Sequence, residues 1–165
     1  MTQRALAFAH LIHARLGATG PPASPALLLA YAPIDVLVED WPSELSGVLL
    51  LRSGRAVIGI NARHSPARRH FTFWHEVGHF LLHAPHAVGG HVDCEAGRPT
   101  SAEREADAFA AAVLMPPEWV RRAHDQSQRR GQLARQFHVS EAAMARRLRE
   151  LGLAGPGDIP SSDSP

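Results

Sequence analysis

The segment from Phe71 to Leu82, FTFWHEVGHFLL, constrains the fold of this chain more than any other. It places two histidines and a glutamate among large apolar residues, and burying such groups is costly unless they find partners. With about 100° between successive residues of a helix, His79 lies about 40° from His75 and about 6 Å further along the axis. Glu76 lies at the edge of the same face, and the aromatic and aliphatic side chains cover the opposite side. The segment is therefore predicted to be a buried helix with one polar stripe.

This polar stripe has the spacing of a catalytic zinc site. Imidazoles at positions i and i+4 can bind one tetrahedral zinc ion, and Glu76 is placed to reach a water on the metal without binding the metal itself. Because zinc makes that water more acidic, Glu76 is expected to accept its proton as general base. Gly78, between His75 and His79, is expected to allow another element to approach closely. The alternative is a structural role for the histidines in a motif that occurs by chance.

The third zinc ligand is expected downstream, in the segment TSAEREADAFAAAVLMPP. Glu103 and Asp107 are spaced i, i+4 on an alanine-rich helix. Glu103 can therefore bind the metal while Asp107 accepts a hydrogen bond from the free ring N–H of a ligand histidine. Glu103 also has an alternative role, because Thr100 and Glu103 have the spacing of a capping box.

Other residues near the histidine helix are weaker candidates for the third ligand. His83 continues the row of histidines, but it lies about 12 Å along the axis from His75, which is too far for one metal to span readily. Glu105 points about 160° away on its own helix and is the fallback. The alternatives that spacing leaves open are His86, His91 and Cys94, in the Gly/Pro-rich segment after the helix, which is predicted to be a loop.

Around these helices the sequence predicts an α+β fold. Further helices are expected at 4–17, 26–31, 117–127 and within 129–152, besides the zinc helix at 67–83 and the helix that begins near Thr100. Three β-rich runs, IDVLVED, SGVLLLR and RAVIGIN, are expected to form a small antiparallel sheet packed on the zinc helix. The third run is predicted to be an exposed edge, where a substrate peptide can add as another strand. Residues 1–152 are predicted to be a single domain, and 153–165 a disordered tail.

Composition limits the cellular setting and the partners. The formal net charge is +1, which gives no general reason to expect a nucleic-acid or membrane partner. The single cysteine fits a reducing compartment, and no apolar run approaches the roughly 20 residues of a membrane helix. The protein is therefore expected to be soluble and cytoplasmic.

The segment LARQFHVSEAAMARRL, within 129–152, offers a different function. Its two helical parts are joined at HVS, with Ser140 positioned as an N-cap, and together they resemble a DNA-binding helix-turn-helix. The expected role is instead an amphipathic helix whose Met144, Leu148 and Leu151 pack on the core, with arginines facing solvent. A DNA- or protein-binding regulator that retains a metalloprotease scaffold is the alternative function.

Three segments taken together resemble the ImmA/IrrE family of zinc metallopeptidases: VIGIN, RRHFTFWHEVGHFLLH and EREADAFAAAVLMP, followed by the helical end. The resemblance implies a compact gluzincin-type fold, Zn²⁺ bound by His75, His79 and Glu103, and Glu76 as catalytic base. It also implies cleavage of a regulatory protein, typically a bacterial helix-turn-helix repressor, in stress responses or the control of mobile elements. No residue matches the family's transition-state-stabilising group, for which the nearby candidates are Tyr31, His64 and His70.

Overall fold

The computed structural model describes residues 3–52, 55–83, 90–94, 99–126 and 129–154, with the backbone alone for residues 52 and 90–94. Nearly all of the tail predicted to be disordered, 153–165, lies outside these ranges. So do the side chains of His86, His91 and Cys94, which the sequence left open as metal ligands.

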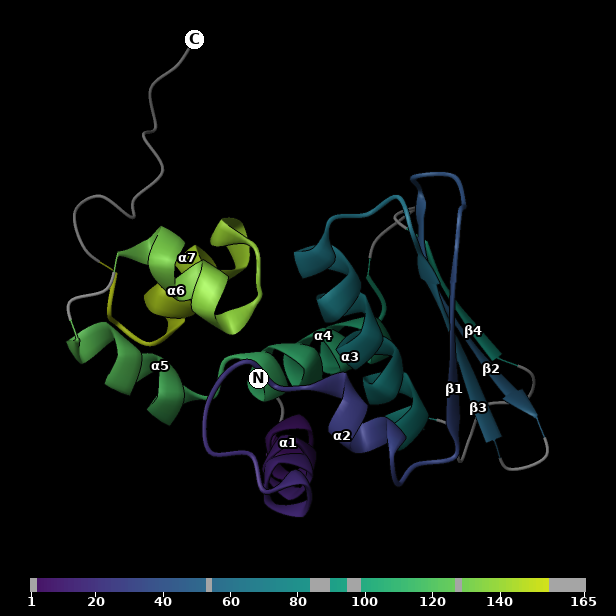
Figure 1. Cartoon of the computed structure of the whole chain (residues 1–165), viewed down its shortest axis with the longest axis horizontal. Coiled ribbons are helices and arrows are strands. Elements are labelled where there is room, and N and C mark those ends of the chain that lie inside the picture. The colour runs from purple at the N-terminus through teal and green to yellow at the C-terminus, as the bar shows by residue number, and fades with distance from the viewer. Residues whose placement is uncertain (1–2, 53–54, 84–89, 95–98, 127–128, 155–165) are drawn as a thin grey trace, which may run out of the picture.

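Seven helices and four strands make up the described part of the chain, and the predicted α+β class is confirmed (Figure 1). In chain order they are α1 (Gln3–Leu16), α2 (Pro25–Leu29), β1 (Ile34–Glu39), β2 (Leu45–Arg52), β3 (Arg55–Asn61), α3 (Pro66–His83), β4 (Gly90–Cys94), α4 (Ser101–Leu114), α5 (Pro117–Asp125), α6 (Arg130–Phe137) and α7 (Glu141–Glu150). The expected helices and the three expected strands are all present, with small changes at their ends.

The sheet differs from the prediction in size and in strand direction. Its order is β1-β3-β2-β4; β2 is antiparallel to β3 and β4, whereas β1 is parallel to β3. The prediction of three antiparallel strands was therefore wrong, because alternation of apolar residues defines the faces of a strand but not its direction. β4 lies in the Gly/Pro-rich segment that was predicted to be a loop. The composition of this segment does not indicate a strand, and the strand forms by pairing with β2.

β3 is a central strand, so the predicted exposed edge at RAVIGIN was also wrong. β1 and β2 flank it on its two sides, and the outer strands of the described sheet are β1 and β4. Ala56, Ile58 and Ile60 are buried on one face of β3, and on the other face the indole of Trp41 covers Gly59. A near-continuous apolar run is typical of a strand that is buried on both faces.

The side chain of Asn61, at the end of β3, holds the connection between β1 and β2. Its amide nitrogen donates to the carbonyl oxygens of Pro42 at 2.9 Å and Leu45 at 2.8 Å, and its amide oxygen accepts from the backbone of Arg63 at 3.0 Å. Asn61 is fully buried, so these bonds replace the water that the amide loses on folding. The turn that leads into β2 is thereby fixed to the strand beside it.

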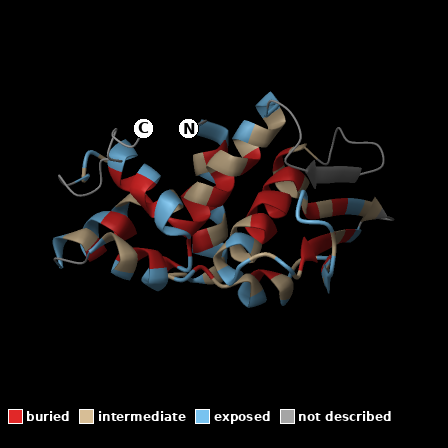
Figure 2. Cartoon of the chain, turned by 90° about the horizontal axis from the view of Figure 1, so that it is seen from above, coloured by how far each residue is buried: buried red, intermediate tan, exposed pale blue. Residues whose placement is uncertain are grey.

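Helix α3 packs on one face of the sheet, and α4 packs against α3 and α1. Figure 1 shows the sheet at one end of the molecule, α3 and α4 in the middle, and α5, α6 and α7 at the opposite end. The buried residues follow the inner faces of these helices, as Figure 2 shows. The largest of the fully buried side chains are Trp74, Phe109 and Phe137. No described helix is long and apolar enough to cross a membrane.

The helical end packs on the rest of the chain through the predicted apolar face. Met144 and Leu148 are buried, and Ser140 caps α7 by accepting a hydrogen bond from the backbone of Ala143. The prediction that the arginines of this helix face solvent was wrong for Arg147. Its side chain is 4 % exposed and donates to the carbonyl oxygen of Met115 at 2.9 Å, because that carbonyl ends α4 without a helical partner.

Candidate metal centre

Helix α3 carries the two histidines and the glutamate of the sequence motif on its buried side. The helix begins where Ser65 accepts a hydrogen bond from the backbone of Arg68, with Pro66 as the first helical residue. At the other end Arg4, from α1, donates to the carbonyl oxygen of Leu82 at 2.8 Å. The polar stripe predicted from the sequence therefore belongs to a helix that is held at both ends.

Helix α4 crosses α3 at Gly78, as the small residue between the histidines predicted. A Cβ atom at Gly78 would lie 3.1 Å from the Cα of Ala106 and 3.0 Å from Cδ1 of Phe109. Only the missing side chain allows the two backbones to approach this closely. The crossing brings the first turns of α4 to the histidine face of α3.

Three side chains from these two helices converge on one point. Nε2 of His75 lies 3.0 Å from Nε2 of His79, and the two carboxylate oxygens of Glu103 lie 3.2 Å from the first nitrogen and 3.3 Å from the second. Both histidines are buried, and Glu103 is 21 % exposed. The ligand atoms of these residues all lie within 4.8 Å of one another, so the group can hold a metal ion. These three side chains are called the cluster below.

The spacing of these atoms is compatible with a tetrahedral metal ion such as zinc. Ligand atoms around a tetrahedral zinc ion, with bonds of about 2.0–2.2 Å, lie about 3.3 Å apart. The three separations measured here are 3.0–3.3 Å. Two nitrogens and carboxylate oxygens that face one another this closely are electron-rich, and a cation between them would relieve their repulsion.

Asp107 lies behind His75, where the sequence placed it. Its Oδ1 atom is 2.9 Å from Nδ1 of His75, so the ring N–H donates to the carboxylate and the lone pair of Nε2 faces the cluster. The side chain of Asp107 is 43 % exposed on its other side. This hydrogen bond fixes both the orientation and the tautomer of His75.

Glu103 combines the two roles that the sequence offered. Its backbone N–H donates to the hydroxyl of Thr100 at 3.2 Å, which caps α4, while its carboxylate reaches His75 and His79. The cap and the cluster therefore do not exclude each other.

Glu76 is completely buried against strand β2. A Cβ atom at Gly47 would lie 2.6 Å from Oε1 of Glu76 and 2.6 Å from a methyl carbon of Thr72, so only glycine fits there. The strand bulges between Leu45 and Gly47, next to Ser46, whose hydroxyl accepts from Arg68 at 2.8 Å. The backbone of β2 thus covers the carboxylate of Glu76.

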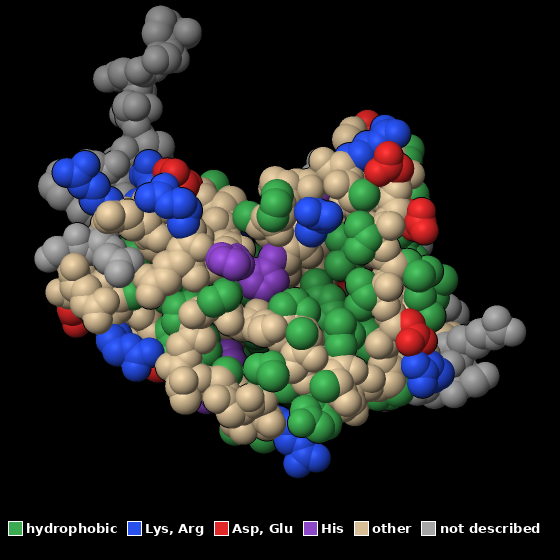
Figure 3. Space-filling model, viewed as in Figure 1, with side chains coloured by type: hydrophobic (Ala, Val, Ile, Leu, Met, Phe, Trp, Pro, Cys, Tyr) green, Lys and Arg blue, Asp and Glu red, His purple; other side chains and the backbone are tan. Residues whose placement is uncertain are grey.

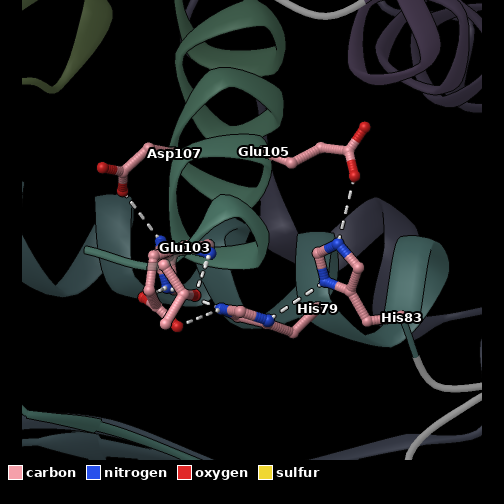
Figure 4. A network of polar contacts seen from close by, with 7 residues as sticks. His79, His83, Glu103, Glu105 and Asp107 are labelled. Atoms are coloured by element: carbon pink, nitrogen blue, oxygen red, sulfur yellow. Dashed lines mark hydrogen bonds and ion pairs between the residues drawn. The ribbon is translucent and has the colours of Figure 1, made fainter.

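Two further residues contact the cluster, although the sequence considered His83 and Glu105 only as weaker candidates for the third ligand. Nδ1 of His83 lies 3.2 Å from Nδ1 of His79, and Nε2 of His83 lies 3.2 Å from Oε2 of Glu105 (Figure 4). The signal in the sequence was the row of histidines at i, i+4 and i+8. Spacing excludes His83 from sharing a metal with His75, but it does not exclude the contact between His83 and His79.

The three residues considered for stabilising a transition state have other contacts. The rings of His64 and His70 bind backbone carbonyl oxygens, that of Ser43 for His64 and those of Ala23 and His138 for His70. The side chain of Tyr31 is 82 % exposed, just after α2. None of these contacts connects the three residues with the histidine cluster.

A groove of ≈ 1110 Å³ runs between α7 and the helices α3 and α4, and Figure 3 shows the surface hollowed between the C-terminal helices and the rest of the molecule. Its wall includes Glu105 and Asp107, which contact the histidine rings from the side away from the convergent atoms. Alanines and the arginines Arg68, Arg104 and Arg146 line much of the remainder. The groove therefore lies beside Asp107, which contacts His75, and beside Glu105, which contacts His83.

Comparisons with known proteins agree with this architecture. The family model described as the IrrE N-terminal-like domain, Peptidase M78, matches residues 29–149. The solved structure of a Mycobacterium tuberculosis transcriptional regulator has a similar fold, with a TM-score of 0.62 and 17 % sequence identity. The similarity covers 89 % of this chain and 46 % of that one, so the chain spans about half the length of the regulator. No curated protein matches the chain.

Proposed function

This chain belongs to the IrrE N-terminal-like family, Peptidase M78, and from that premise we propose that it is a zinc-dependent endopeptidase that cleaves a regulatory protein. The observation that carries the proposal is the convergence of His75, His79 and Glu103 on one point. Two imidazoles and one carboxylate are the ligand set of a catalytic rather than a structural zinc site, because they leave one coordination position open.

In this proposal each residue of the cluster has a separate task. His75, His79 and Glu103 would hold the ion, and Asp107 would orient His75 through its Nδ1–H. When bound, zinc would supply a Lewis acid that activates water and polarises the scissile carbonyl group. Glu76 would accept a proton at its carboxylate and pass it to the leaving amine. Its complete burial supports this role, because the carboxylate is kept from bulk water on the helix that carries both histidines.

The substrate that we propose is a transcriptional repressor, the class implied by the resemblance of the chain to the ImmA/IrrE family. The edge of the sheet that can receive an extended peptide is an outer strand, β1 or β4, and no longer β3. The buried apolar face of α7 supports packing as the main role of the helical end, in preference to DNA binding.

A pair of variants tests the proposal. Glu76→Gln is expected to keep bound zinc, because the side chain is not a ligand, and to abolish cleavage, because the base is removed. Glu103→Ala is expected to lose most of the zinc affinity. Zinc is measured by metal analysis, and cleavage by mass spectrometry after co-expression with candidate repressors, chiefly any encoded beside this gene.

The two possible failures of this experiment have different meanings. If Glu76→Gln cleaves as fast as the unmodified protein, Glu76 is not the base. If the unmodified protein binds zinc but cleaves no candidate, while still binding a repressor or DNA, the chain is a regulator that retains a metalloprotease scaffold.

A further inference from the structure

We propose that His83 and Glu105 form a relay that positions His79, as Asp107 positions His75. The inference rests on the proposed metal centre and assigns it two more residues. Metal-binding histidines almost always donate their second ring N–H to a fixed acceptor, which sets the orientation and tautomer of the ring. For His75 that acceptor is a carboxylate, whereas for His79 it is the ring of a third histidine.

The geometry of the relay is continuous from α4 to the cluster. Oε2 of Glu105 lies 3.2 Å from Nε2 of His83, and Nδ1 of His83 lies 3.2 Å from Nδ1 of His79. The side chains of His83 and Glu105 are 22 % and 19 % exposed, so water is largely kept from both contacts. In Figure 4 Glu105 and Asp107 point to opposite sides of α4, with Glu103 between them.

The position of protons along the relay follows from the metal. A zinc ion at Nε2 of His79 needs the lone pair of that atom, so the proton of the neutral ring is on Nδ1. This N–H faces Nδ1 of His83, which must then be an acceptor, and the proton of His83 is therefore on Nε2. That second N–H donates to Glu105, whose carboxylate can only accept. Each group thus has one arrangement of protons, and all of them support metal binding.

The relay also gives a role to both of the acidic residues that follow Glu103 and project from opposite sides of α4. Asp107 contacts the ligand histidine His75 directly. Glu105 projects from the opposite side of α4, and one imidazole ring lies between it and His79. His83, one turn beyond His79 on α3, fills that space. In this arrangement Glu105 acts on the metal centre through His83.

The test measures zinc affinity by competition with a chelator, for the full chain and four variants. Glu105→Ala and His83→Ala are each expected to weaken zinc binding by about 10- to 100-fold, the usual effect of removing an orienting partner. Glu105→Gln is expected to restore most of the affinity, because its amide oxygen can still accept from His83. Glu118→Ala is the matched control, because Glu118 is exposed on α5. The zinc affinity of this variant is expected to be unchanged.

A double variant separates a relay from a general effect on the fold. If Glu105 acts through His83, Glu105→Ala changes zinc affinity by less than about 2-fold once His83 is already alanine, because the two single effects are not additive. A further loss of 10-fold or more in that background would overturn the relay. Nitrogen-15 NMR of the histidine rings gives a second readout in the zinc-loaded protein. His83 is expected to carry its proton on Nε2, and a proton on Nδ1 contradicts the proposal even if the alanine variants do not fold.

Failure of the relay can be told apart from failure of the proposed function. If the unmodified protein binds zinc while Glu105→Ala and His83→Ala bind it equally well, the metal centre stands and the relay is wrong. If the unmodified protein binds no zinc, both are wrong.

Discussion

Replacing Gly78 with alanine tests the close crossing of α3 and α4 on which the cluster depends. The added methyl group would lie 3.0 Å from the ring of Phe109 and 3.1 Å from the backbone of Ala106, both of which are completely buried. Neither atom is the end of a mobile side chain, so α4 must move by a few tenths of an ångström. Ala106 lies between Glu105 and Asp107 in the sequence, and this movement is therefore transmitted directly to the acidic residues.

Two effects of opposite sign determine the stability of Gly78→Ala. Alanine in the middle of a helix stabilises it by about 0.5–1 kcal/mol relative to glycine. Overpacking a tight interface costs about 1–3 kcal/mol. The net expectation is a loss of about 1 kcal/mol, or about 2–4 °C in the melting temperature of a chain of this size. Zinc affinity is expected to fall by at least about 10-fold, because metal–ligand distances tolerate changes of only about 0.2 Å.

Thermal unfolding of the metal-free protein and chelator competition measure the two effects separately. Gly131→Ala in α6 is the matched control, because its nearest neighbour is a carboxylate oxygen of Glu141, an exposed and movable side chain, at 3.1 Å. This control is expected to be neutral or stabilised by at most about 1 kcal/mol. The reasoning is refuted if Gly78→Ala behaves like the control and keeps the zinc affinity of the unmodified protein.

Two further predictions concern the stability of the fold. Burial lowers the pKa of His13 below its usual 6.5, partly offset by the hydrogen bond to the carbonyl of Val113. The unfolded state then binds more protons below about pH 6.5, so His13 makes the protein less stable as the pH falls. Urea unfolding at pH 7.5 and 5.5 is expected to show a smaller pH effect for His13→Gln, and an equal effect contradicts this account. Asn61→Asp removes the amide donor from three carbonyl oxygens, those of Trp41, Pro42 and Leu45, and places a buried negative charge beside them. It is expected to cost at least about 2 kcal/mol in urea unfolding at pH 7, and an unchanged midpoint would show that these bonds do not hold the turn.

Helical spacing explains why much of the site could be predicted from the sequence. His75 and His79 share a face of any helix that contains both, and Glu103 and Asp107 likewise, so the only unknown was whether the two faces meet. Gly78 indicated that they do. Glu103 and not Glu105 joins the convergent group, as the angles on α4 predicted, but the contact of Glu105 with His83 was not foreseen. The contact with His83 depends on how far α4 is rotated against α3, which the spacing within one helix does not define.

The sheet shows a different limit of sequence reasoning. The strands β1, β2 and β3 were recognisable from their apolar runs, and the hairpin from the short connection between β2 and β3. The parallel pairing of β1 with β3 was not recognisable in the sequence. It depends on the path of the connection between β1 and β2, which Asn61 holds. β4 lacked a signal because its glycine and polar residues have low β-propensity, and only pairing with β2 makes it a strand.

The division of the cluster between two helices has a thermodynamic consequence. Both histidines that would bind the ion come from α3, and the carboxylate comes from α4, so an ion bound to all three recognises only the packed pair of helices. Its binding therefore adds to the free energy of unfolding, by about 2.7 kcal/mol when the free ion is at 100 times its dissociation constant. By the same linkage, any change that separates α4 from α3 lowers the affinity for the ion. If the chain binds zinc as proposed, occupancy of the site and packing of the two helices would be linked equilibria, and the supply of zinc would influence the stability of the fold.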